Sequence, residues 1–348
     1  MARPLKGDAR HRFLGLAIPL LIVGLMASWV LLLLFAFGLI YAAWIAAPGA
    51  FRTTIGGSTP EWGDALYFSG ITLATVGYGD FQPVHVFLRV VAIIEGFSGV
   101  AVISLSIAYV LEIYPIIQRK RVLAVLLNEE TAGQVSALPL LVRYLRNNNF
   151  EALADLLRLI NMEMLTVAEA HRRLPVLHYS HPVEVERSFL RVLLVVRNLV
   201  ATLRYGVASG RGIAWSQDPR VRGLEDTLFY TLHTLGSSLH LPLGAAPDGE
   251  EHEQRIEATF QELCDRLLSY GLPSPGRTAG GAGASSEFDA VYASFHRFYT
   301  VTEAPLTSYL RNSGYTLAEA TEVAARPQQL VSELEVADIL RIQDEEDD

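Results

Sequence analysis

The chain has 348 residues, of which 51% are hydrophobic and 19% charged, and its formal net charge is −9 at pH 7. This acidic balance argues against nucleic acid as a partner. The single cysteine, Cys264, excludes an intramolecular disulfide bond and fits a reducing compartment. The apolar excess is concentrated in the first third of the chain.

The first apolar run carries no charged residue between Arg12 and Arg52, a stretch of 39 residues. A helix that crosses a bilayer needs about 20 residues. The apolar core of a cleavable signal peptide is only ~7–15 residues long. We therefore predict a retained transmembrane helix over residues 13–48. Within it, Tyr41 and Trp44 are typical of the outer interfacial belt.

Basic residues flank the two apolar runs of the chain. Residues 1–12 are basic and precede the first run, and residues 119–121 (Arg-Lys-Arg) follow a second run at residues 84–118. Positive charge is retained on the cytoplasmic side of a membrane. We therefore expect a multi-pass protein of the cell membrane with both termini in the cytoplasm and the loop at residues 49–60 outside.

Residues 61–74 predict a short helix between the two apolar runs. Glu61 and Asp64 lie in its first turn, where acidic side chains are favourable. The segment is too short to cross a bilayer, and such a re-entrant helix is tolerated only where protein buries it. Its C-terminal end would direct partial negative charge at a cation.

Residues 75–80 read Thr-Val-Gly-Tyr-Gly-Asp and follow this helix directly. Successive backbone carbonyls and the Thr75 hydroxyl can replace the water shell of a cation if four chains direct them at one axis. Gly77 and Gly79 permit the backbone angles that this requires. The side chains of Val76 and Tyr78 would point away from the ion. A glycine-rich turn between strands is the alternative, but the flanking segments do not resemble strands.

Residues 72–80 (TLATVGYGD) and their flanks resemble the pore signature of the two-transmembrane potassium channels of bacteria, over about residues 13–118. The resemblance implies a homotetramer with one central pore and K⁺ as the permeant ion, without a cofactor. The implied K⁺ ligands are in the filter: Thr75, Val76, Gly77, Tyr78 and Gly79. It also implies that Asp80, Tyr67 and Thr72 support the filter and its outer mouth.

In the family, the aromatic residue that matches Tyr67 forms a hydrogen bond with the residue that matches Asp80, behind the filter. Simple packing of Tyr67 at the interface is the other interpretation. The sequence leaves both open.

Glu95 is a carboxylate about two turns into the second apolar run. Intramembrane acids are costly and usually face protein or water. Glu95 could be a functional group in gating or pH sensing, with Ser69 or Thr72 as its partner. It could instead be a structural pin that fixes one helix against another. Gly99 matches the position at which the inner helices of the family often bend, although close helix packing is the alternative.

Ile103, Ile107 and Leu111 recur every four residues and share one helix face. In four copies this face would line the inner cavity, where a ring of apolar side chains can close a pore by dewetting. Packing against the first helix is the alternative for each residue. Pro115 is expected to end or bend the helix.

Residues 119–271 predict a helical cytoplasmic domain that resembles no family that we recognise. Residues 182–203 predict an amphipathic helix whose arginines exclude a third crossing. Asn149 is a predicted N-cap, and Thr166 and Thr316 each begin a predicted capping box. A flexible linker at 272–286, a helical segment at 287–343 and an acidic tail at 344–348 complete an all-α chain.

Several modules are absent from the sequence. No phosphate-binding glycine motif follows a predicted strand, and no catalytic nucleophile or paired metal ligands stand out. We therefore do not expect an enzyme. The alternative to a gated channel is a membrane-anchored sensor or assembly protein, whose helical domain binds a ligand or partner while the pore is subordinate. The sequence does not name the gating stimulus.

Overall fold

The computed structural model describes residues 7–54, 61–179, 182, 184–207, 214–239, 249–275, 284–313 and 315–321. The chain divides into two compact units. The membrane unit comprises Arg12–Pro115. The C-terminal unit begins at Ile116, and residues 7–11 group with it. In the described part of the chain the fold is all-α, as the sequence predicts, apart from one two-stranded antiparallel sheet in the membrane unit, called the hairpin below although α2 lies between its strands.

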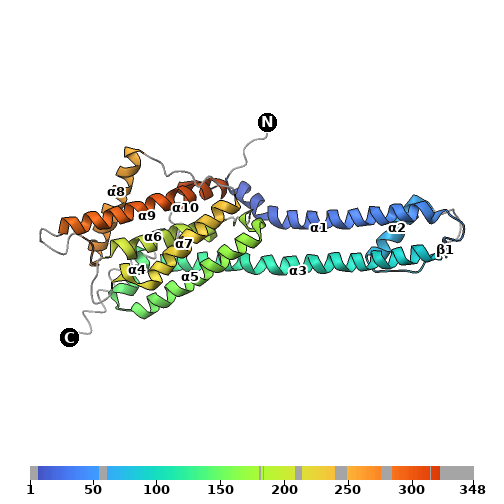
Figure 1. Cartoon of the computed structure of the whole chain (residues 1–348), viewed down its shortest axis with the longest axis horizontal. Helices are drawn as coiled ribbons and strands as arrows, with labels where there is room; N and C mark the ends of the chain where they lie inside the picture. Colours follow the sequence, from blue (N-terminus) through green and yellow to red (C-terminus); the bar gives the residue numbers. More distant parts are fainter. Residues whose placement is uncertain are drawn as a thin grey trace. The chain divides into compact units, whose positions relative to one another are not determined.

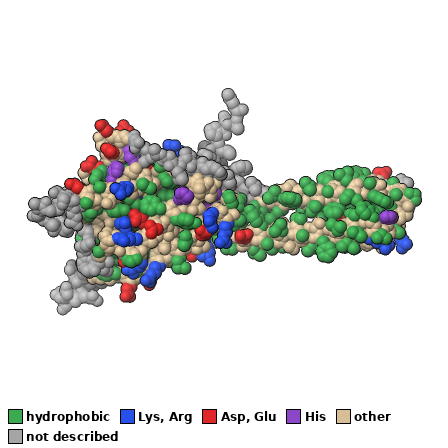
Figure 2. Space-filling model, viewed as in Figure 1, with side chains coloured by type: hydrophobic (Ala, Val, Ile, Leu, Met, Phe, Trp, Pro, Cys, Tyr) green, Lys and Arg blue, Asp and Glu red, His purple; other side chains and the backbone are tan. Residues whose placement is uncertain are grey.

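The membrane unit is built from three helices, α1 (Gly7–Ile45), α2 (Trp62–Leu73) and the first part of α3 (Val86–Glu130) (Figure 1). Two helical segments, Ile22–Ile45 and Val86–Glu130, are long and apolar enough to cross a membrane. Hydrophobic side chains cover the visible face of α1 and α3 (Figure 2). These helices expose apolar residues that water would not solvate favourably.

The hairpin consists of β1 (Phe51–Thr53) and β2 (Phe81–Pro83), paired antiparallel with Arg52 opposite Gln82. It joins the segment before α2 to the segment after the filter. Sequence reasoning missed it, because three-residue strands carry too little periodicity to be read. Two phenylalanine rings, Phe51 of β1 and Phe68 of α2, pack edge-on against the ring of Tyr41 on α1. These three residues belong to the hydrophobic core of the membrane unit.

The inner helix differs from its predicted limits. We expected it to end near residue 118, but α3 continues through Pro115 to Glu130, so Pro115 does not end the helix. A bend at Pro115 stays a prediction. The added turns place Leu123, Ala124 and Leu127 in the core of the C-terminal unit. Burial of these side chains compensates for the backbone hydrogen bond that a proline removes.

The C-terminal unit surrounds α6 (Phe189–Ala201), whose side chains are buried on almost every side. Its other helices are α4 (Leu138–Arg146), α5 (Phe150–Arg173), α7 (Pro219–Ser238), α8 (Glu250–Ser269), α9 (Ala284–Ser313) and α10 (Leu317–Thr321) (Figure 1). Short helical turns lie at η1 (Pro175–Tyr179), η2 (Val185–Arg187) and η4 (Trp215–Gln217). A π-helical turn, η3 (Thr202–Gly206), follows α6 directly.

Several local predictions in the C-terminal unit are wrong. The helix expected from residue 182 begins at Phe189, with its N-cap at Ser188. Thr166 lies inside α5, where its hydroxyl donates to the Met162 carbonyl. Threonine hydroxyls bond to the local backbone in helix interiors as well as at caps. Asn149 occupies the N-cap position of α5 as predicted, but its side chain makes no capping hydrogen bond.

Other local predictions are met. Thr316 and Glu319 form the expected capping box at the start of α10. One boundary is corrected: α9 begins at Ala284, so the last residues of the predicted linker at 272–286 are helical. The predicted acidic tail at 344–348 lies outside the described residues.

Candidate ion-conducting site

The filter segment has an alternating backbone. Thr75, Gly77 and Gly79 have φ angles of +57°, +54° and +80°, whereas Val76 and Tyr78 do not have positive φ. This alternation turns successive carbonyl groups toward one side of the strand. Glycine adopts a positive φ readily, but the same conformation costs Thr75 about 1–2 kcal/mol. The glycines were predicted from the sequence, and the left-handed threonine was not.

The C-terminal end of α2 holds the filter through the backbone N–H groups of the filter. Val76 and Gly77 donate to the Ile71 carbonyl at 2.8 and 3.2 Å, and Thr75 donates to Thr72 at 3.0 Å. Among the described residues, the carbonyls of Thr75 to Tyr78 accept no hydrogen bond. The carbonyl of Gly79 instead accepts from Gln82 Nε2 at 3.2 Å.

The predicted supporting residues lie next to the filter. Tyr67 Oη donates to Asp80 Oδ2 at 2.7 Å, and the Phe81 amide donates to Asp80 Oδ1 at 3.1 Å. The Tyr67 ring also packs edge-on against Phe81, so hydrogen bonding and packing occur together. The Thr72 hydroxyl donates to the Phe68 carbonyl within α2. It contacts neither Asp80 nor Glu95 through a hydrogen bond.

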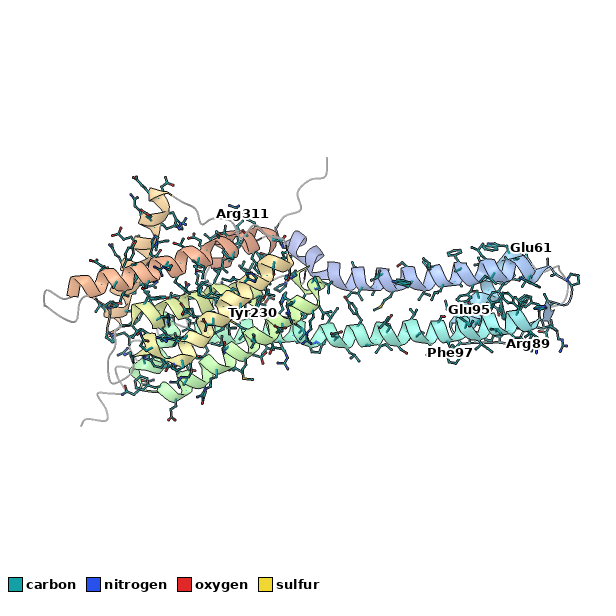
Figure 3. All side chains as sticks on the ribbon, in the orientation of Figure 1. Glu61, Arg89, Glu95, Phe97, Tyr230 and Arg311 are labelled. Atoms are coloured by element: carbon teal, nitrogen blue, oxygen red, sulfur yellow. The ribbon has the colours of Figure 1, made fainter. Side chains whose placement is uncertain are left out.

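Glu95 is fully buried between the three helices of the membrane unit. Ser69 Oγ of α2 donates to Glu95 Oε1 at 2.5 Å, and Tyr41 Oη of α1 donates to Oε2 at 2.7 Å. Figure 3 shows Glu95 on the inner side of α3 and Phe97, two residues later, on the outer side. The carboxyl group therefore has the geometry of a pin that joins α1, α2 and α3.

Tyr41 corrects an expectation. We assigned it to the outer interfacial belt together with Trp44, but its side chain is fully buried and bonded to Glu95. No spacing along the sequence links residues 41 and 95. Only the packing of α1 against α3 brings them together.

Gly99 lies against the backbone of the pore helix. A Cβ atom at this position would be 2.0 Å from the Leu73 carbonyl oxygen, closer than real atoms approach. At Gly96 the nearest atom, the Thr72 carbonyl oxygen, would be 3.9 Å away, an ordinary contact. The structure therefore shows the close packing that was the alternative at Gly99. Bending at this position stays a prediction.

The predicted cavity stripe is exposed in the single subunit. Ile103, Ile107 and Leu111 are not buried against α1 or α2. Val76 and Tyr78 of the filter are also exposed, Tyr78 to 72%. These apolar side chains need further protein or lipid to cover them.

The C-terminal unit contains a buried cationic side chain on α3 that sequence reasoning missed. Lys120 Nζ donates to the Leu177 carbonyl at 3.1 Å and lies 3.4 Å from His171 Nε2. His171 Nδ1 is 2.7 Å from the Val167 carbonyl, which fixes Nε2 as the acceptor. Burial, and then the charge of Lys120, hold the pKa of His171 well below its ordinary value.

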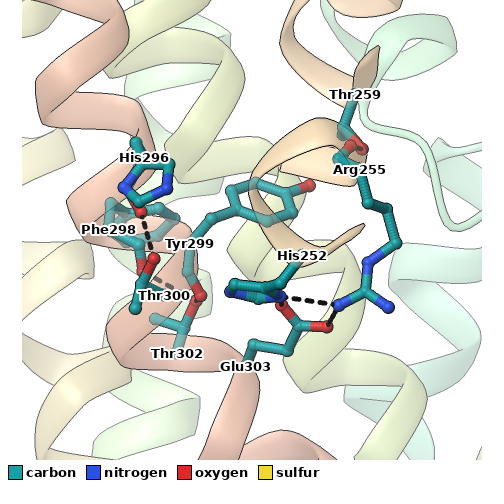
Figure 4. Close-up of polar contacts among 9 residues, drawn as sticks. All are labelled: His252, Arg255, Thr259, His296, Phe298, Tyr299, Thr300, Thr302 and Glu303. Atoms are coloured by element: carbon teal, nitrogen blue, oxygen red, sulfur yellow. Dashed lines mark hydrogen bonds and ion pairs between the residues drawn. The ribbon is translucent and has the colours of Figure 1, made fainter. Parts of the chain in front are cut away.

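A surface groove of about 610 Å³ lies along α8 and α9, lined by Glu253, Tyr292 and His296 among others. Beside it, Arg255 of α8 donates to Glu303 of α9 at 2.5 Å (Figure 4). Among the described residues, no group of three or more acidic, histidine or cysteine side chains could hold a metal ion. The contacts in Figure 4 therefore join two helices rather than form a metal centre.

The comparisons with known proteins support the membrane unit. Residues 28–114 match the ion channel family. The chain is also 25% identical over 205 residues to the uncharacterized membrane protein YdjJ of Bacillus subtilis (strain 168). This match covers 59% of the chain and 58% of the relative, so a large part of the relative has no counterpart here.

The match to the relative spans 205 residues of the chain. Only 115 residues precede the start of the C-terminal unit at Ile116, so part of the match must lie in that unit. No solved structure matches the chain. The family match covers α2, the filter and the membrane part of both long helices. Residues 28–114 are therefore similar to the ion channel family, and the two apolar helices and the membrane-protein relative indicate a membrane protein.

Proposed function

We propose that four copies of this chain form a potassium-selective channel that conducts K⁺ passively across the cell membrane. One observation carries the proposal. The positive φ angles at Thr75, Gly77 and Gly79 direct consecutive carbonyls to one side of a strand whose N–H groups are held by α2. Such a row of carbonyls is the ligand set that replaces the hydration shell of K⁺.

The proposed tetramer follows from the filter. One chain supplies one row of carbonyls, which lies on one side of an ion and leaves the other sides open. Four rows around an axis enclose the ion. The exposed side chains of Val76 and Tyr78 support this arrangement, because neighbouring copies would cover them.

The proposed gate lies on α3, at Ile103, Ile107 and Leu111. In four copies these exposed side chains would form an apolar constriction that closes by dewetting. The gating signal would come from the C-terminal unit, with both termini in the cytoplasm. The continuity of α3 to Glu130 and the burial of Lys120 beside α5 support this coupling.

Ion flux through reconstituted protein tests the proposal. Liposomes with the purified chain should pass K⁺ and exclude Na⁺. Gly77→Ala should abolish selective flux, because alanine is strained at a φ of +54°. Gly63→Ala is the matched control: an added Cβ also meets nothing within 4 Å there, but the backbone of Gly63 has no positive φ.

Two results would contradict the proposal. Equal conduction of Na⁺ and K⁺ by the wild-type chain would exclude a potassium filter. A purified protein that stays monomeric in lipid would exclude a pore built from four copies. Retention of flux in Gly63→Ala shows that loss in Gly77→Ala comes from the filter backbone.

A further inference from the structure

Three basic side chains are buried together in the C-terminal unit: Lys120 of α3, His171 of α5 and His178 of η1. The Lys120 amine and the His171 ring both lie against the ring of Phe189 on α6, at 5.8 and 5.6 Å from its centroid. The ring of His178 lies 4.8 Å from that of His171. All four residues belong to the C-terminal unit, so one compact unit builds the whole cluster.

Lysine is rare in this chain, and its use at position 120 matters chemically. Of the 28 lysine and arginine residues, only Lys6 and Lys120 are lysines. An arginine keeps its charge in a protein, whereas a buried lysine can lose its proton. Of the basic triplet at residues 119–121, Arg119 is half-exposed and paired with Glu163, and Lys120 is buried. The side chain of the triplet that is buried in this cluster is therefore the one that can become neutral.

The hydrogen bonds of the cluster suit a neutral amine. Lys120 Nζ has two acceptors, the Leu177 carbonyl at 3.1 Å and His171 Nε2 at 3.4 Å, and a neutral amine carries two hydrogens. Among the described residues, the titratable groups around Lys120 are His171 and, beyond it, His178, and the charge that acts on it is that of Arg121. These neighbours are basic, so they do not favour a third hydrogen and its positive charge.

The attachment of Lys120 is coupled to a proton. Burial, and then the charge of Arg121, lower the pKa of Lys120 to about 7, whereas a lysine in water has a pKa of about 10.4. Release of Lys120 into water between these two pH values therefore takes up a proton. This contribution to attachment is complete above a pH of about 10.4, is lost as the pH falls to about 7, and changes no further below that. His171 adds a separate response below a pH of about 6.5.

We propose that Lys120, His171 and His178 form a proton-sensitive latch, which attaches α3 to α5, η1 and α6 while Lys120 is neutral and releases α3 when Lys120 takes up a proton. The latch lies on the helix that carries the proposed gate, since α3 runs from Val86 to Glu130. Its role in gating rests on the proposed channel function. The latch itself needs only the contacts within the C-terminal unit.

Hydrogen exchange of the full-length protein tests the latch. In the wild type, exchange of the amides at residues 120–127, corrected for intrinsic rates, should quicken about tenfold as the pH falls from 9 to 8, because release takes up one proton. Lys120→Met has no titratable group, so its exchange should stay slow across this range. Lys120→Arg keeps its charge, so its exchange should be fast throughout. Lys6→Met removes the other lysine and should keep the wild-type response.

Wild-type exchange that does not depend on pH, or the same dependence in Lys120→Met, would overturn the latch. Unchanged exchange in α6 would show that the variants still fold, and the wild-type pH dependence does not rely on any variant.

Ion flux through reconstituted protein tests the role of the latch in gating. Wild-type K⁺ flux should change between pH 9 and pH 7, and this change should be absent in Lys120→Met. Flux that stays constant while exchange responds to pH would overturn the role in gating and leave the latch. A wild type that passes no K⁺ at any pH would contradict the proposed channel, and the exchange rates would still decide whether the latch exists.

Discussion

The membrane part and the C-terminal part of α3 each carry a buried ionisable side chain, but the partners differ in kind. Glu95 accepts hydrogen bonds from the hydroxyls of Ser69 and Tyr41. Lys120 contacts a backbone carbonyl and His171. Serine and tyrosine hydroxyls remain donors across the physiological pH range. Burial, and then the charge of Arg121, lower the pKa of Lys120 to about 7, so the charge of the second attachment changes near neutral pH.

In the proposed channel, this difference would suit a filter that stays ordered while the gate moves. Glu95 and Gly99 hold α3 against α1 and α2, which carry the filter. Lys120 holds the far end of the same helix against α5 and η1. The predictions below test whether the two attachments differ in strength and in pH dependence.

The largest effect is expected from Gly99→Ala. The added methyl group would be 2.0 Å from the Leu73 carbonyl oxygen, so α3 or the end of α2 must move. We expect loss of selective K⁺ flux in liposomes. Gly96→Ala is the control, because its methyl group would meet only an ordinary contact at 3.9 Å. Normal flux in both variants would show that the α3–α2 contact is not required.

Glu95→Ala should have the next largest effect, a loss of about 3 kcal/mol of stability in the membrane unit, because two buried hydroxyls lose a charged or strongly polar acceptor. The measurement is thermal unfolding of the purified protein in detergent. Phe97→Ala is the control, since Phe97 is exposed on the other side of the same turn (Figure 3). If the two variants lost equal stability, Glu95 would not act as a pin.

The smallest effect is expected at His171. Its pKa is depressed in the folded state, so the unfolded chain binds the proton more readily. The part of the stability that depends on neutral His171 is therefore complete above a pH of about 6.5 and falls below it, by up to about 1.4 kcal/mol per pH unit. Hydrogen exchange in α5, corrected for intrinsic rates, should quicken between pH 7.5 and 5.5.

His171→Gln should remove most of this pH dependence, because glutamine does not titrate. His233→Gln on α7 is the control, since His233 is exposed. An unchanged response in His171→Gln would place the acid-sensitive group elsewhere in the unit.

The backbone of residues 75–79 was largely predictable from the sequence, because the features that determine it are local. Carbonyl spacing, glycines at residues 77 and 79 and a short preceding helix are all encoded within one stretch of chain. The positive φ of Thr75 was not readable, since threonine seldom adopts it. It persists because hydrogen bonds from α2 hold the residues around it.

The C-terminal unit was readable only as a set of helices. A lysine between two arginines predicts a basic segment in water beside the membrane. Lys120 is instead buried, because it contacts His171 and Leu177, which lie about fifty positions away in the sequence. The continuation of α3 beyond Pro115 likewise depends on a core that the rest of the unit builds. Such non-local packing leaves no periodic signal at the position itself.

The β1–β2 hairpin has a consequence for the order of events during biogenesis. By pairing Phe51–Thr53 with Phe81–Pro83, it closes the base of the loop that carries α2 and the carbonyl row. Closing a loop costs chain entropy, and because both strands that close this loop belong to one chain, pairing them needs no second chain. Protomers that arrive already ordered associate with less loss of freedom than protomers that must fold on contact.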